Sequence, residues 1–295
     1  MSDQITGLWV ALATPLDSAG HVDHAEFARH ATSLLAAGCD GVVPFGTTGE
    51  GPSFTNGERL AATEALLAAG IAPGQIALGT GSAAIPDTVE LTRQALGLGL
   101  THAMVLPPFY FRDVTEQGIE DAFAQIIDAV GSDRLRLCAY HIPQVSGVPV
   151  PARALGRLRA RYGKIVAGVK DSTGDFDSFL AFRREAPDVG ALIGDETKIA
   201  RARAEGGVGT ICGMANIAPA LVRRMFSDSP DVTAMAAACA LISGPFLPLL
   251  KATLAAQTGH AGWRAVRPAW VAASAGEGAR IAAALAVLAQ AKAAE

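Results

Sequence analysis

Short runs of apolar residues alternate along the chain with longer segments in which apolar residues recur at helical spacing. The short runs are apolar throughout instead of alternating with polar residues, a pattern typical of parallel strands covered by helices. We therefore expect strands over 7–13, 41–45, 75–79, 102–106, 136–141, 165–169, 190–193 and 208–211. Helices are expected over 23–37, 55–69, 85–98, 115–130, 151–161, 175–186, 197–205 and 218–226.

Residues that favour helix ends support several of these boundaries. Asp23 precedes a helical run, and Thr55 has Glu58 three residues later, the spacing of a capping box. Gly38 and Gly70 follow expected helix ends, where a left-handed residue is common. The alternating pattern is therefore supported by local signals as well as by hydrophobicity.

Eight strand-and-helix units in succession predict an α/β fold, a closed (β/α)₈ TIM barrel. The alternative is an open doubly wound sheet, but Ala13-Thr14-Pro15-Leu16 stands where its dinucleotide fingerprint would follow the first strand. Further helices are expected over 231–256, 262–273 and 277–293. We divide the chain into a barrel, residues 1–228, that carries the active site, and a carboxyl-terminal helical extension, residues 229–295, packed on it.

The composition and net charge of the chain limit the classes of partner that we expect it to bind. The chain of 295 residues is 50% apolar with a formal net charge of −4, which argues against nucleic acid or an anionic membrane as the main partner. No apolar stretch approaches the roughly 20 residues of a membrane helix, and the amino end is a poor signal peptide. Four separated cysteines in apolar contexts are typical of a reduced, cytoplasmic protein.

Lys170 is the most informative candidate, because it directly follows the apolar strand IVAGV. In such barrels the catalytic groups lie at the carboxyl ends of the strands. Removal from water at that position favours the neutral amine, which can attack a ketone and form an imine that acts as an electron sink. The alternative is a buried ion pair with Asp171 or Glu50.

Other candidates stand at neighbouring strand ends. The turn Gly46-Thr47-Thr48-Gly49 offers hydroxyls and backbone amides that suit a carboxylate, or it is an ordinary strand-to-helix turn. Tyr140 can carry protons or fill the core, and Tyr110 can belong to an interface. Asp195 and Glu196 can bind sugar hydroxyls or cap the next helix. His141 has no second ligand at metal spacing, so we expect neither a metal nor another cofactor.

Four motifs, each at an expected strand end, resemble the dihydrodipicolinate synthase and N-acetylneuraminate lyase family: GTTGE at 46–50, YHIP at 140–143 with SG at 146–147, GVKDSTGD at 168–175 and GTICGMAN at 209–216. The resemblance implies a class I aldolase mechanism on pyruvate or another 2-keto acid, with Lys170 as the Schiff-base lysine and Tyr140 as the proton shuttle. It implies that Thr47 and Thr48 hold the pyruvate carboxylate and that Ile211 lines the pocket. It also implies that Tyr110 is lent to a neighbouring subunit in a homotetramer.

Two departures from the family pattern bear on the substrate. Val145 stands where dihydrodipicolinate synthases carry an arginine that binds the aldehyde's carboxylate, and His141 replaces the usual asparagine. Asp195, Glu196 and Ser146 are suited to sugar hydroxyls. We therefore favour a 2-keto-3-deoxy sugar acid aldolase or dehydratase. The alternatives are 4-hydroxy-tetrahydrodipicolinate synthase and, in another class, a non-catalytic ligand-binding barrel.

Overall fold

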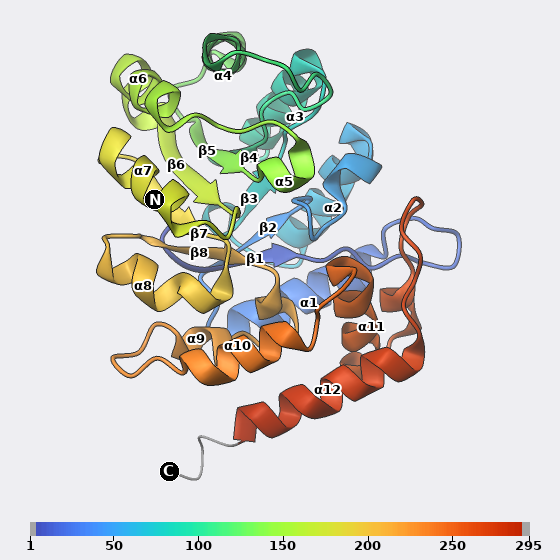
Figure 1. Ribbon diagram of the computed structural model, residues 1–295. Helices are drawn as coiled ribbons and strands as arrows, with labels where there is room; N and C mark the ends of the chain where they lie inside the picture. Colours follow the sequence, from blue (N-terminus) through green and yellow to red (C-terminus); the bar gives the residue numbers. More distant parts are fainter. Residues whose placement is uncertain (1–3, 291–295) are drawn as a thin grey trace.

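The computed structural model describes residues 4–290 as a barrel of eight parallel strands surrounded by helices (Figure 1). The strands follow the order β2-β1-β8-β7-β6-β5-β4-β3, and a parallel bridge between Val42 and Ile76 joins the two ends of this series. The strands are β1 (Gly7–Leu12), β2 (Gly41–Pro44), β3 (Ala77–Gly79), β4 (His102–Val105), β5 (Arg136–His141), β6 (Val166–Asp171), β7 (Gly190–Ile193) and β8 (Gly209–Cys212). The (β/α)₈ TIM barrel expected from the sequence is confirmed.

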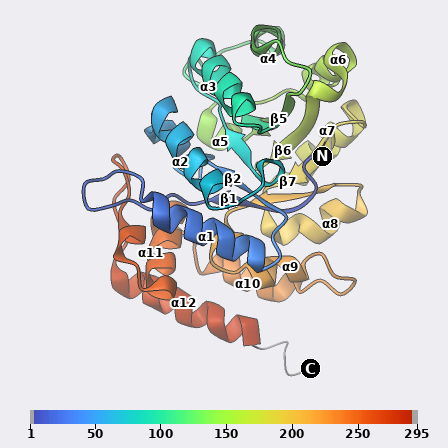
Figure 2. The same cartoon turned by 180° about the vertical axis from the view of Figure 1, so that it is seen from behind.

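Helices follow the strands around the outside of the barrel, as Figure 2 shows from behind. They are α1 (His24–Ala36), α2 (Asn56–Ala68), α3 (Ile85–Gly97), α4 (Glu116–Val130), α6 (Ala152–Tyr162), α7 (Phe176–Glu185), α8 (Ile199–Ala204) and α9 (Pro219–Arg224). The short helix α5 (Pro143–Ser146) lies in the loop after β5. Each of the eight longer helices overlaps the range expected for it.

The predicted helix ends are made by the expected side chains. Asp23 accepts a hydrogen bond from the backbone N–H of Glu26 at the start of α1. Thr55 and Glu58 form both bonds of a capping box at the start of α2. Gly38, with φ +91°, and Gly70, with φ +87°, follow helix ends in the left-handed region.

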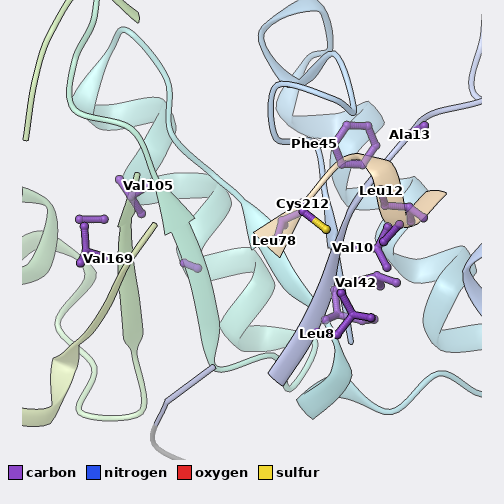
Figure 3. Close-up of a cluster of buried hydrophobic side chains, with 14 of the residues drawn as sticks. Leu8, Val10, Leu12, Ala13, Val42, Phe45, Leu78, Val105, Val169 and Cys212 are labelled. Carbon is purple, nitrogen blue, oxygen red and sulfur yellow. The ribbon is translucent and has the colours of Figure 1, made fainter. Parts of the chain in front are cut away.

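Side chains alternate between the inside of the barrel and the layer beneath the helices. Figure 3 shows part of the outer cluster, including Val10, Val42 and Val169. A second cluster fills the interior of the barrel and includes Trp9, Ala11, Met104, Cys138, Tyr140 and Ile211. Since neighbouring residues of a strand point to opposite faces, the outward position of Val169 directs Lys170 inward.

The carboxyl-terminal extension departs from the sequence expectation in two places. The helix expected over 231–256 is two helices, α10 (Val232–Ala240) and α11 (Phe246–Thr258), because Gly244-Pro245 interrupts the backbone pattern. The helix expected over 262–273 is wrong: only the 3₁₀ turn Ala261–Arg264 forms there. Pro268 cannot donate a helical hydrogen bond, and Val271 is 82% exposed.

The last helix, α12 (Ala275–Gln290), packs against α11 and agrees with the expected helix up to residue 290, beyond which that expectation lies outside the described residues. Within residues 4–290, no helix is long and apolar enough to span a membrane.

Candidate active site

Lys170 and Tyr140 lie side by side on the inner face of the barrel. They are direct partners in the register between β5 and β6, and they are 4% and 3% exposed. The amine nitrogen of Lys170 lies over the Tyr140 ring, 4.3 Å from its centroid. The lysine therefore points into the barrel mouth at the position that the strand pattern predicted.

The two carboxylates considered as ion-pair partners of Lys170 have other partners. Glu50 forms its ion pair with Lys251, at 2.6 Å. Asp171, on the opposite face of β6, accepts hydrogen bonds from the backbone N–H and the hydroxyl of Thr173, at 2.8 and 2.6 Å. Within the described residues, Lys170 takes part in no ion pair. The buried-ion-pair interpretation of Lys170 is therefore wrong for both partners.

The turn after β2 brings a hydroxyl to the phenol of Tyr140. The Oγ1 atom of Thr47 lies 3.1 Å from the Tyr140 hydroxyl oxygen, and either group can be the donor. The neighbouring Thr48 is buried, and its Oγ1 lies close to Gly213 after β8, 3.2 Å from where a Cβ would be. The turn thus spans the space between β5 and β8 across the barrel mouth.

Tight backbone packing fixes this turn. A Cβ at Gly49 would lie 2.7 Å from the carbonyl oxygen of Leu12, so the close approach requires glycine. The Thr14 hydroxyl donates to the Gly49 carbonyl at 2.9 Å. Gly46 faces Met104 in the barrel interior, where a Cβ would lie 2.9 Å from the Met104 Cε. The expectation of a tight turn at 46–49 therefore agrees with the geometry, and the binding of a carboxylate there stays a prediction.

Ile211 is fully buried in β8 and belongs to the same interior cluster as Tyr140. The two side chains therefore share the interior of the barrel. The expected role of Ile211 in lining the substrate pocket stays a prediction.

Asp195 and Glu196 take different partners after β7. Asp195 accepts hydrogen bonds from the backbone N–H of Thr197 and from Lys198, at 3.0 and 2.6 Å. Burial opposes ionisation of Asp195, but these hydrogen bonds together lower its pKa. Glu196 is buried and accepts from the backbone N–H of Met214 at 2.9 Å. Burial raises the pKa of Glu196, so this carboxyl keeps its proton to a higher pH than that of Asp195 does.

Capping of the next helix was one of the two interpretations of Asp195 and Glu196, and such a cap is present at Asp195. Its side chain opens the 3₁₀ turn Glu196–Lys198. Glu196, by contrast, reaches across to the segment after β8. The pair is therefore divided between a structural cap and a buried carboxyl near the barrel mouth.

Ser146 has its hydrogen bonds inside its own turn. Its Oγ lies 2.9 Å from the carbonyl oxygen of Val148 and 3.1 Å from that of Ile142. Val145, one residue earlier, is 58% exposed. Of the pair Val145 and Ser146, neither side chain supplies a charge at the rim.

Arg112 does bring a cation to this rim. A Cβ added at Gly147 would lie 2.8 Å from the Nε atom of Arg112, so the guanidinium lies directly over that turn. Arg112 is exposed and, among residues 4–290, forms no ion pair. The position of Arg112 depends on how the loop after β4 folds, so it could not be placed from the sequence pattern alone.

Tyr110 is not brought to Lys170 within this chain. It is 76% exposed, and its ring packs edge to face on Phe111, 5.2 Å between centroids. Its expected role in a neighbouring subunit stays a prediction.

The sequence pattern did not find the partner of Glu50. Lys251 lies 201 residues further along the chain, in α11 of the extension. A lone lysine inside the apolar run PFLPLLKATLAA is an available signal, because such a lysine is seldom buried without a partner.

Two further observations concern metal binding and a hollow near the site. In the described part of the chain, no group of three or more His, Cys, Asp or Glu side chains is arranged to hold a metal ion. A surface hollow of about 610 Å³ lies on the outer side of the turn, with Arg59, Asp87 and Glu90 in its wall. We assign the site to the barrel mouth because the hollow contains neither Lys170 nor Tyr140.

Comparison with known proteins agrees with this geometry. Residues 4–261 match the Dihydrodipicolinate synthetase family. An uncharacterized DapA-like lyase of Chloroflexus aurantiacus is 37% identical over 240 residues, which cover 80% of this chain and 79% of that protein. A 4-hydroxy-tetrahydrodipicolinate synthase of Rhodospirillum centenum is 36% identical over 220 residues, 74% of this chain and 73% of that protein.

A solved structure gives the same result for the fold. The crystal structure of dihydrodipicolinate synthase from Agrobacterium tumefaciens superposes with a TM-score of 0.90 and 36% sequence identity. The match covers 96% of this chain and 99% of that one. The likeness therefore includes the carboxyl-terminal extension as well as the barrel.

Proposed function

The chain is a lyase of the dihydrodipicolinate synthetase family, and from this premise we propose that Lys170 forms a Schiff base with pyruvate or another 2-keto acid. One observation carries the proposal: a buried amine without an ion-pair partner among residues 4–290 lies against Tyr140, whose hydroxyl reaches Thr47. A desolvated amine, an acid–base group and a relay hydroxyl are the parts that imine chemistry requires.

The reaction follows from these groups. The Lys170 amine adds to the keto carbon, and Tyr140 returns a proton to the oxygen so that the carbinolamine loses water. The resulting iminium draws electrons from the adjacent carbon. Loss of a proton from that carbon leaves an enamine, which in a dehydration expels the hydroxyl of the next carbon as water once that hydroxyl has taken up a proton. Loss of an aldehyde from the same carbon, in an aldol cleavage, also leaves an enamine. In the reverse direction, the enamine attacks an aldehyde and forms the new carbon–carbon bond.

The turn after β2 supplies the anion site in this proposal. The hydroxyl of Thr48 and the backbone amides between Gly46 and Gly49 hold the carboxylate of the keto acid, while Thr47 passes protons to Tyr140. Donors in a rigid turn lose little freedom when the anion binds, which makes them effective. Ile211 contacts the apolar part of the substrate.

We further propose a 2-keto-3-deoxy sugar acid, or a related 2-keto acid, as the substrate. Val145 offers no charge to a second carboxylate, and the buried Glu196 is suited to donate to or accept from a hydroxyl. Relatives named as 4-hydroxy-tetrahydrodipicolinate synthases support the alternative, condensation of pyruvate with aspartate semialdehyde. Arg112 over Gly147 is the feature of this chain that favours that alternative.

The same proposal includes the cellular setting and the assembly. We propose a cytoplasmic homotetramer, which binds a small-molecule substrate and neither nucleic acid nor membrane. Three of the four cysteines, Cys39, Cys138 and Cys212, are buried and free, as in a reducing compartment. The exposed aromatic pair Tyr110 and Phe111 supports contact with a second copy.

Borohydride trapping tests the Schiff base directly. Pyruvate with sodium borohydride should add one stable reduced adduct, which peptide mapping assigns to Lys170. Lys170→Ala should remove the adduct and all turnover while the circular dichroism spectrum stays unchanged. Lys164 and Lys198 serve as internal controls, since both are more exposed than Lys170. A label on either of them, or no label, would show that the assignment is incorrect.

A further inference from the structure

Directly after the turn at 46–49 stands Glu50, whose carboxylate is completely enclosed. The side chains of Glu50 and Lys251 are each 0% exposed, and they form an ion pair at 2.6 Å. The second carboxylate oxygen of Glu50 accepts the backbone N–H of Arg267 at 2.9 Å. Both oxygens are therefore held by the carboxyl-terminal extension, one by α11 and one by the segment after residue 264.

The same segment also binds the residues that directly follow the turn. The guanidinium of Arg267 donates to the carbonyl oxygen of Ser53 at 2.6 Å and pairs with Glu58. It also lies over the Phe54 ring, 4.0 Å from the centroid. The extension thus holds both Glu50, directly after the turn, and the residues that follow it.

The backbone of the turn needs such support. Phe45 and Glu50, which flank Gly46–Gly49, have φ of +58° and +55°, a region that residues with a side chain rarely adopt. Conformations of this kind persist only where surrounding contacts over-determine them, and they gather at functional sites. Between these two residues lies Thr47, whose hydroxyl must reach Tyr140.

Stability alone does not explain the ion pair. Enclosing two charges costs free energy that their attraction repays only with good geometry, and neutral residues of similar volume often give an equally stable protein. The pair does, however, fix a position, because it sets where Glu50, directly after the turn, lies relative to α11.

We propose that Glu50 and Lys251 are positioning residues through which the extension holds Thr47 in reach of Tyr140. The inference rests on the proposed roles of Thr47 and Tyr140 in proton transfer. It assigns a function in the reaction to the extension, which contributes no residue to the barrel mouth in the proposed mechanism.

The test measures proton transfer without a second substrate. In D₂O, the enamine of pyruvate picks up deuterium at its methyl carbon, and proton NMR follows the loss of the methyl signal. Lys251→Met removes the tie but leaves a buried, unpaired carboxylate, which can prevent folding. The double variant Glu50→Gln/Lys251→Met removes both charges at similar volume, and it keeps an oxygen that can accept from Arg267.

The matched control is a variant of a second contact between the barrel and the same extension. Glu26 is buried in α1 and accepts from the indole of Trp263, which belongs to the extension. Glu26→Gln should lower the unfolding midpoint without changing the exchange rate per folded enzyme. This control separates loosening of the extension in general from release of the turn.

We expect the double variant to unfold near the wild-type midpoint, to be labelled at Lys170 by pyruvate and borohydride, and to exchange the methyl protons at least about tenfold more slowly. The kcat of exchange should fall more than the KM for pyruvate rises. A double variant that exchanges at the wild-type rate would overturn the inference alone. Absence of the adduct in the wild-type protein would overturn the proposed function, and with it the inference.

Discussion

The amine nitrogen of Lys170 lies 4.3 Å from the centroid of the Tyr140 ring, because the two residues are direct partners across β5 and β6. The Tyr140 hydroxyl lies at the far end of that ring, within 3.1 Å of the Thr47 Oγ1. The face of the Tyr140 ring contacts the amine of Lys170, and its hydroxyl contacts that of Thr47. Tyr140 can therefore hold the lysine in place and transfer protons for it. The first prediction tests the second of these roles.

Tyr140→Phe keeps the ring and removes the hydroxyl. Turnover should fall by about 10²-fold or more, the usual contribution of a general acid–base group. Imine trapping with borohydride should become slower but remain. Thr47→Val should cause part of the same loss, and the double variant should be little worse than Tyr140→Phe, because the two groups act in one relay. Unchanged turnover of Tyr140→Phe would mean that the hydroxyl only packs.

The barrel and its lysine could be predicted from the sequence because both depend on local patterns. Period two within a strand places Val169 outside and Lys170 inside, and the capping box at Thr55 marks the next helix start directly. Irregular backbone was not predictable in the same way. Apolar residues near Trp270 mimic a helical face, although Val271 is largely exposed.

Contacts between residues that are distant in the sequence could not be predicted either. Glu50 was considered for Lys170, but it pairs with Lys251, in α11. Arg112 is brought to Gly147 by the fold of the loop after β4. No spacing in the sequence encodes either approach, since each depends on how two separate segments pack.

The second prediction concerns pH and His30. This residue is 4% exposed, and its Nε2 bonds to the Oδ1 of Asn216 at 3.1 Å. Burial lowers the pKa of His30 from 6.5 to about 4, so the unfolded chain takes up a proton at a higher pH than the folded one. The stability that neutral His30 confers is therefore complete above pH 6.5 and is lost as the pH falls towards 4. The loss should reach about 3 kcal/mol.

Urea unfolding between pH 8 and pH 4 measures this loss. His30→Gln, which can still donate to Asn216, should remove most of the decline below pH 6.5. His24→Gln, at an exposed position of the same helix, should leave the decline as it is in the wild type. If His30→Gln shows the full decline, a different group is responsible for it.

The third prediction is about assembly. Tyr110 and Phe111 are 76% and 75% exposed and adjacent, an arrangement typical of a contact surface. Light scattering should report a homotetramer, and Phe111→Asp should dissociate it and reduce turnover. Val287→Asp introduces the same charge at an apolar position of α12 that is 66% exposed, and it should leave both properties unchanged. A fully active wild-type monomer would exclude a required Tyr110 from another subunit.

The last prediction is the substrate. A second carboxylate, as in aspartate semialdehyde, needs a cation at the rim, since an unpaired buried charge is costly by several kcal/mol in principle. Val145 supplies none, and the buried Glu196 would repel such a group when ionised. Catalytic efficiency with a 2-keto-3-deoxy sugar acid should therefore exceed that with aspartate semialdehyde. Val145→Arg should shift the ratio towards the charged aldehyde.

Arg112 provides the counter-test, because its guanidinium lies over Gly147, two residues after Val145. Arg112→Ala should leave the sugar acid reaction nearly unchanged and remove residual activity with aspartate semialdehyde. The decisive measurement is kcat/KM for both substrates with the wild type, Val145→Arg and Arg112→Ala side by side. If aspartate semialdehyde is the better wild-type substrate by tenfold, about 1.4 kcal/mol in transition-state binding, the argument from Val145 is wrong. In that case a large loss in Arg112→Ala would show that this arginine replaces the missing one, because a bidentate guanidinium can bind the second carboxylate from either loop.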